Sequence, residues 1–174
     1  ASVGLDGNRI FFGEHRRLHA DSTNSGAVSV FELLENGWSQ TDLIFPKGPT
    51  AAFGDFGWPL VIEGNTLVVN SYDSPSGDGR SGAYVFEHVE GEWLQTARIQ
   101  SFAGEPHIGT FHTDSFGSTM AIDNGELVIG AWLEWLKSTG RAGAAYVFRF
   151  QDTGGGVGSD SDKDGIPDQW EIDN

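Results

Sequence analysis

The chain of 174 residues carries 25 acidic and 10 basic side chains, 25 glycines and no cysteine. Its net charge of −15 disfavours nucleic acids and anionic membrane surfaces as partners, and favours a cationic partner or a divalent metal. The absence of cysteine excludes disulfide scaffolds, cysteine-ligated zinc and thiol nucleophiles, and no apolar run approaches the ~18 residues that a membrane helix needs.

The sequence repeats a unit of roughly 55 to 62 residues. Residues 56–68 (FGWPLVIEGNTLV) align with residues 116–128 (FGSTMAIDNGELV), and residues 2–10 match the inner part of the same segment. The second half of the unit also recurs, at residues 25–44, 81–99 and, in a shorter copy, 142–150. A period of this length is typical of stacked or circular repeat architectures.

Each unit is expected to be a four-stranded antiparallel meander. Its apolar runs are short, rich in β-forming residues and separated by clusters of Gly, Asn, Asp and Ser. The segments 6–8, 63–65 and 123–125 hold Gly and Asn residues that supply the positive φ of tight hairpin turns. In the middle copy, strands are expected near residues 58–62, 65–71, 82–88 and 92–99.

Repeated four-stranded meanders predict an all-β fold of β-propeller blades. Blade 1 is expected at about 1–45, blade 2 at about 53–99 and blade 3 at about 116–150. Three blades make an incomplete propeller, because propellers close with about four to eight, and open sheet edges favour self-association or a longer chain. A β-sandwich or an open stack of sheets is the alternative.

A family resemblance rests on paired dipeptides in these copies. Phe116-Gly117 is followed by Gly130-Ala131, and Phe56-Gly57 is followed by Asn70-Ser71. These segments resemble the FG-GAP repeats of integrin-type β-propellers, over about residues 1–150. The resemblance implies a secreted or cell-surface protein that acts in adhesion or assembly.

The chain departs from the FG-GAP pattern at two places. Tyr72 and Trp132 stand where the proline of the GAP triplet would be. The resemblance would put a calcium loop near residues 73–79, but only Asp73 and Asp78 supply carboxylates there. An ordinary turn is therefore favoured over a metal site in this loop.

A glycine-rich linker at residues 151–159 separates the repeats from an acidic segment at residues 160–174. Counted from Asp160, this segment has acids at positions 1, 3, 5, 9 and 12 and Gly165 at position 6, which is the spacing of a calcium loop. The expected calcium ligands are Asp160, Asp162, Asp164, Ile166 (through its carbonyl), Asp168 and Glu171. The alternative is a solvated, disordered acidic tail.

The acidic segment also resembles one bacterial thrombospondin type 3 repeat, a family that strings such units in tandem as calcium-stiffened stalks. Only one unit is present, and no helix can precede Asp160 through the glycine linker, so a paired EF-hand is not encoded. An isolated half-site is expected to bind calcium weakly, with Kd of about 10⁻⁴ to 10⁻³ M.

No catalytic constellation stands out. His107, His112 and Asp114 could hold zinc or act as a base, but their spacing matches no ligand pattern. His15 and His19 are four residues apart, yet two arginines between them would repel a cation. No serine lies in a nucleophile elbow. We therefore expect no enzyme activity.

The aromatic residues divide into two groups. Trp38 and Trp93 occupy equivalent places in successive copies and are expected in the core between blades, as are three phenylalanines, Phe31, Phe86 and Phe148. Trp132 and Trp135 occur in one copy only. Core filling is favoured for this second pair, and an exposed position would suit a sugar ring or a protein partner.

The sequence thus predicts a non-catalytic, extracellular, calcium-binding module for adhesion, surface assembly or protein interaction. Its expected partner is a protein or glycan on a cell surface or in the matrix. Two alternatives stay open: a carbohydrate-binding module that uses the loop tryptophans, and an accessory domain of a larger secreted enzyme.

Overall fold

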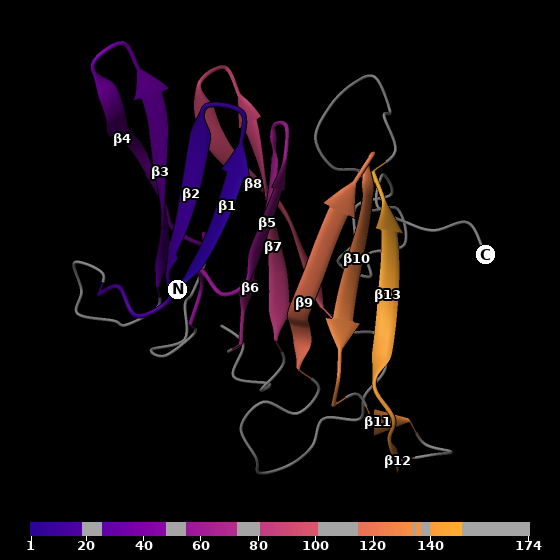
Figure 1. Ribbon diagram of the computed structural model, residues 1–174. Coiled ribbons are helices and arrows are strands. Elements are labelled where there is room, and N and C mark those ends of the chain that lie inside the picture. The colour runs from indigo at the N-terminus through magenta and orange to yellow at the C-terminus, as the bar shows by residue number, and fades with distance from the viewer. Residues whose placement is uncertain are drawn as a thin grey trace.

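The computed structural model describes residues 1–18, 26–47, 55–72, 81–100, 115–133, 135–136 and 140–150. These residues form thirteen β-strands and no α-helix, which confirms the predicted all-β class. Figure 1 shows the strands gathered into sheets that stand side by side.

Two sheets have four antiparallel strands in sequence order. The first sheet contains β1 (Ser2–Asp6), β2 (Arg9–Glu14), β3 (Ala27–Leu34) and β4 (Gly37–Ile44). The middle sheet contains β5 (Leu60–Glu63), β6 (Thr66–Ser71), β7 (Gly82–Val89) and β8 (Glu92–Gln100). The four strands predicted for the middle copy are therefore present as a meander.

The third sheet has the same beginning. Within the described residues it orders β9 (Phe116–Asp123), β10 (Glu126–Ala131) and β13 (Ala144–Arg149), again antiparallel. A short hairpin of β11 (Trp135–Leu136) and β12 (Gly140–Arg141) lies between β10 and β13 in the chain.

The first hairpin of every sheet turns through a residue with positive φ. Gly7, Gly64 and Asn124 have φ values of 56°, 54° and 52°, so the same turn recurs at equivalent positions. This is the turn chemistry that the sequence predicted. These hairpin turns lie at the upper edge in Figure 1, and the C-terminal ends of β2 and β6 lie at the lower edge.

The middle sheet is buried on both faces because side chains alternate along its strands. Leu67 and Val69 point toward the first sheet, where they share an apolar cluster with Phe11, Val28 and Val30. The opposite face packs on the third sheet through a second cluster, which includes Val68, Val85, Ile99, Leu127, Ile129 and Phe148. The three sheets are therefore stacked face to face.

The stack is arranged as neighbouring propeller blades are. The first strands of the sheets lie next to one another, since β1 contacts β5 and β5 contacts β9. In a sandwich of two sheets, each sheet has one face exposed to solvent, whereas the middle sheet here has an apolar cluster on both faces. Within the described residues the sheets form an open stack and not a closed ring.

The predicted core aromatic residues divide according to their sheet. Phe86 and Phe148 are buried, as predicted, and the Trp93 ring packs edge-on against Phe11 of the first sheet at 5.3 Å. Trp38 is 46% exposed and Phe31 is only partly buried, so their assignment to a core was wrong. Both lie on the outer face of the first sheet, which no described sheet covers.

Candidate functional site

The Phe-Gly dipeptides connect each sheet to the one before it. Phe56 is buried in the cluster between the first and middle sheets, with its ring 5.6 Å from Tyr84. Phe116 is buried in the cluster between the middle and third sheets. Each phenylalanine therefore anchors the start of its own sheet in the preceding interface.

The glycines of these dipeptides permit a close backbone approach between sheets. Gly57 has φ of 110°, and its carbonyl accepts a hydrogen bond of 2.6 Å from Ser2 Oγ of the first sheet. Gly117 has φ of 82°, and a Cβ atom there would collide with Asn70 Oδ1 of the middle sheet. Positive φ and lack of space both require glycine.

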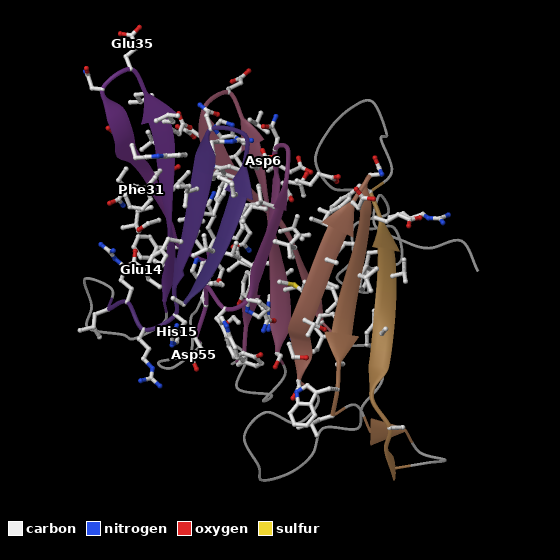
Figure 2. All side chains as sticks on the ribbon, viewed as in Figure 1. Asp6, Glu14, His15, Phe31, Glu35 and Asp55 are labelled. Atoms are coloured by element: carbon white, nitrogen blue, oxygen red, sulfur yellow. The ribbon has the colours of Figure 1, made fainter. Side chains whose placement is uncertain are left out.

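The hairpin turns add polar links between the sheets. The Glu63 carboxylate accepts hydrogen bonds from the backbone N–H groups of Asn124 at 2.7 Å and Gly125 at 3.2 Å. On the other side of the middle sheet, Arg9 donates to the Gly64 carbonyl and lies 5.6 Å from the centre of the Trp93 ring. Figure 2 places Asp6, the ion-pair partner of Arg9, near this upper edge.

Four aromatic residues and one acid lie at the opposite edge, which we call the lower rim. His15, Tyr72 and Trp132 directly follow β2, β6 and β10, and the other two members are Trp58 and Asp55. Trp132 is 66% exposed, so the favoured core position for it was wrong. The Trp58 ring lies 5.5 Å from that of Tyr72 and is half exposed. Figure 2 shows His15 and Asp55 at this edge.

Burial, and then the Asp55 carboxylate, raise the pKa of the Tyr72 phenol above its usual range. The phenol therefore keeps its proton at neutral pH and can donate or accept a hydrogen bond. Flat aromatic faces beside such polar groups suit contact with another molecule.

One comparison with known proteins supports the repeat. Residues 111–148 match the family model of the FG-GAP repeat. The matched segment contains Phe116-Gly117, the Gly130-Ala131 pair and the strands β9 and β10. A search of curated proteins found no match to the chain. The resemblance is thus supported in the third copy, whereas no finding shows a thrombospondin type 3 repeat.

The expected calcium ligands lie outside the described residues: Asp160, Asp162, Asp164, Ile166, Asp168 and Glu171. The loop at 73–79 and the group His107, His112 and Asp114 also lie outside them. The linker at 151–159 and the acidic segment at 160–174 therefore stay predictions.

The structure describes only part of two other predicted features, the His15–His19 pair and Trp135. His15 lies at the lower rim and His19 lies outside the described residues. Arg17, which follows His15, forms an ion pair of 2.8 Å with Glu14. Trp135 belongs to β11, but its side chain is not described.

The described part of the chain lacks two features. No three or more His, Asp or Glu residues cluster there in a way that could hold a metal ion. No helix there is long and apolar enough to cross a membrane.

Sequence reasoning missed the turn-to-turn links. Their signal was present, because Asp6, Glu63 and Asp123 hold the same place in successive copies and each precedes a turn. An acidic residue that recurs at a turn indicates a partner in the neighbouring copy as readily as solvent exposure.

Proposed function

We propose that the chain is a non-catalytic extracellular module for protein interaction, adhesion or surface assembly, with calcium bound by its C-terminal loop. The observation that carries the proposal is the FG-GAP match at residues 111–148, which falls on a sheet stacked as propeller blades are. Domains built from FG-GAP repeats are generally non-catalytic and serve protein interaction in integrin-like propellers.

The stack offers two kinds of surface for such a role. The buried clusters hold the sheets together as a rigid β scaffold, and binding residues commonly lie at the edges of such scaffolds. The lower rim supplies exposed aromatic rings, and the outer faces of the end sheets supply apolar side chains.

Calcium binding rests on the spacing of oxygen ligands in the acidic segment. A hard cation prefers six to eight oxygens, which alternate carboxylates and one carbonyl of a tight loop provide. Residues 159–174 contain six acidic residues and one lysine, so the loop repels itself when no cation is bound. Calcium relieves this repulsion and orders the segment, which would stiffen a stalk.

An NMR titration of the full-length chain tests the calcium site. We expect the amide signals of residues 160–171 to shift on calcium addition with Kd of about 10⁻⁴ to 10⁻³ M, and magnesium to compete poorly. Glu171→Gln should weaken binding more than Asp168→Asn, because position 12 supplies two oxygens directly.

Asp173→Asn is the matched control, since it removes the same charge outside the loop. It should leave the affinity nearly unchanged. If the amide signals do not move up to about 10 mM calcium, an order above the weakest extracellular sites, the segment is an acidic tail and the metal assignment fails.

Carbohydrate binding is a second candidate, favoured by Trp132 and Trp58 at the lower rim. A glycan array with the full-length chain tests it: Trp132→Ala and Trp58→Ala should each reduce a specific signal at least about tenfold, because aromatic stacking on a sugar is lost. Trp38→Ala is the control, since Trp38 is as exposed as Trp58 but lies on another surface. Equal losses in all three variants would contradict binding at the lower rim.

A further inference from the structure

The outer face of the first sheet repeats the residues of a buried interface. In the middle sheet, the cross-strand row Ile62, Leu67, Phe86 and Gln95 packs toward the first sheet, with Leu67 and Phe86 buried. The equivalent row of the first sheet is Leu5, Ile10, Phe31 and Gln40.

We call this outer surface of the first sheet the leading face. Leu5 is 68% exposed there, and further apolar side chains of this face are exposed as well: Val3, Phe12, Leu33 and Trp38. A surface with the composition of a blade interface is therefore open to solvent.

The outer face of the third sheet shows the complementary pattern, and we call it the trailing face. In the middle sheet, the row Val61, Val68, Val85 and Ala97 packs on the third sheet. The equivalent row of the third sheet is Ala121, Val128 and Val147. Val128 and Val147 are 39% and 41% exposed, whereas Val68 and Val85 are fully buried.

We propose that the leading face of one copy docks on the trailing face of a second copy of this chain. The contact would continue the two sheet interfaces already present within the chain, with the same rows facing each other. The proposal deepens the assembly role and rests on it, and it names the partner as the chain itself.

Side-chain size supports this pairing. Phe12 of the leading face stands where the middle sheet has Val69, and Ala121 of the trailing face stands where it has Val61. At these two positions the leading face is bulkier and the trailing face smaller than the middle sheet. The two changes compensate when the faces meet.

Charge placement supports it as well. Arg9 lies over the Trp93 ring across the internal interface, and Glu32 is opposite Arg9 in the register of β2 and β3. The third sheet has Glu126 and Arg149 at this pair, with the charges exchanged and an ion pair of 2.7 Å. In the docked pair, Glu126 takes the place that Arg9 has in the internal interface, and Trp38 of the second copy takes the place of Trp93. Arg149, the cross-strand neighbour of Glu126, can therefore supply the cation beside Trp38.

The turns provide a third match. Glu63 accepts hydrogen bonds from the turn of the following sheet, and Asp123 is its equivalent on the third sheet. In the docked pair, the Asp123 carboxylate faces the backbone N–H groups of the turn at Gly7 and Asn8. The carboxylate acceptor on the third sheet and the N–H donors on the first sheet thus repeat the hydrogen-bonding groups of the internal interface.

Sedimentation of the full-length chain over a range of concentrations tests the proposal. A contact between different faces repeats, so species should grow beyond dimers, as rings or as linear chains. Leu5→Lys and Val128→Lys each place an ammonium group in the contact and should lower the association constant at least about 30-fold. Both positions are exposed in a single copy, so each variant should keep the wild-type circular dichroism spectrum.

Mixing the two variants separates this contact from other kinds of association. Each variant alone should be monomeric, but the mixture should form a 1:1 dimer, because one retains its trailing face and the other its leading face. Leu18→Lys, at an equally exposed leucine outside both faces, should associate like the wild type. Arg149→Glu can replace Val128→Lys if that variant does not fold.

Three outcomes would overturn the proposal: a monomeric wild type up to roughly 100 µM, self-association of Val128→Lys alone, or a mixture that stays monomeric. None of them affects calcium binding by residues 160–171 or glycan binding at the lower rim. Failure of the head-to-tail contact and failure of the proposed function are therefore distinguishable.

Discussion

Replacement of Phe116 by alanine is expected to lower the free energy of unfolding by about 3–5 kcal/mol. Phe116 is fully buried between the middle and third sheets, where Val85, Leu127 and Ile129 belong to the same cluster. Removing the ring leaves a cavity that two rigid sheets cannot close. Urea unfolding followed by circular dichroism measures the loss.

Phe12→Ala is the matched control for this variant. Phe12 is a phenylalanine in the same fold but lies on the exposed leading face. In dilute solution, where copies are separate, its loss should cost no more than about 1 kcal/mol. Similar losses for both variants would mean that Phe116 is not buried between two sheets.

Gly117→Ala should also destabilise the chain, by about 2–4 kcal/mol. Alanine at φ of 82° carries a backbone penalty of about 1 kcal/mol, and its Cβ would collide with the Asn70 side chain, which adds about 1–3 kcal/mol. Denaturant unfolding of the variant gives this value directly.

Gly7→Ala separates these two contributions. Gly7 also has positive φ, at 56°, but nothing lies within 4 Å of a Cβ atom built there. Its substitution should therefore cost only the backbone penalty of about 1 kcal/mol. If Gly7→Ala and Gly117→Ala lose equal stability, the close approach of Gly117 to the middle sheet is contradicted.

The strands and turns of the stack were predictable from the sequence because they depend on local features. Alternating apolar residues and the turn residues Gly7, Gly64 and Asn124 determine a hairpin wherever they occur. Because the unit repeats, the same prediction applied to each sheet. The predicted bounds were close to the observed ones: β7, for instance, runs one residue past the predicted 82–88.

The burial of equivalent residues was not predictable in the same way. Trp38 and Trp93 occupy equivalent places in similar segments, NGWSQT and GEWLQT. Trp93 has Phe11 of the preceding sheet beside it, whereas Trp38 has no described sheet there. Burial depends on the neighbour in space, and a repeat in sequence does not say where a stack begins.

The candidate sites differ for a related reason. The calcium loop is a local pattern of carboxylates, so its spacing alone makes it a definite hypothesis. The lower rim places Asp55, Tyr72 and Trp132, which come from different parts of the sequence, at the same edge of the stack. The sequence showed that Tyr72 and Trp132 break the GAP pattern, but only the stacked fold places them at one edge.

Hydrogen exchange tests the central claim, that the sheets are stacked as blades of one body. In the wild type, the amides of β6 and β7 should exchange most slowly, since this sheet is covered on both faces. In Phe116→Ala, exchange should accelerate in β6 and β7 as well as in β9 and β10. Acceleration confined to residues 116–149 would mean that the third sheet does not pack on the middle sheet, and would contradict the account.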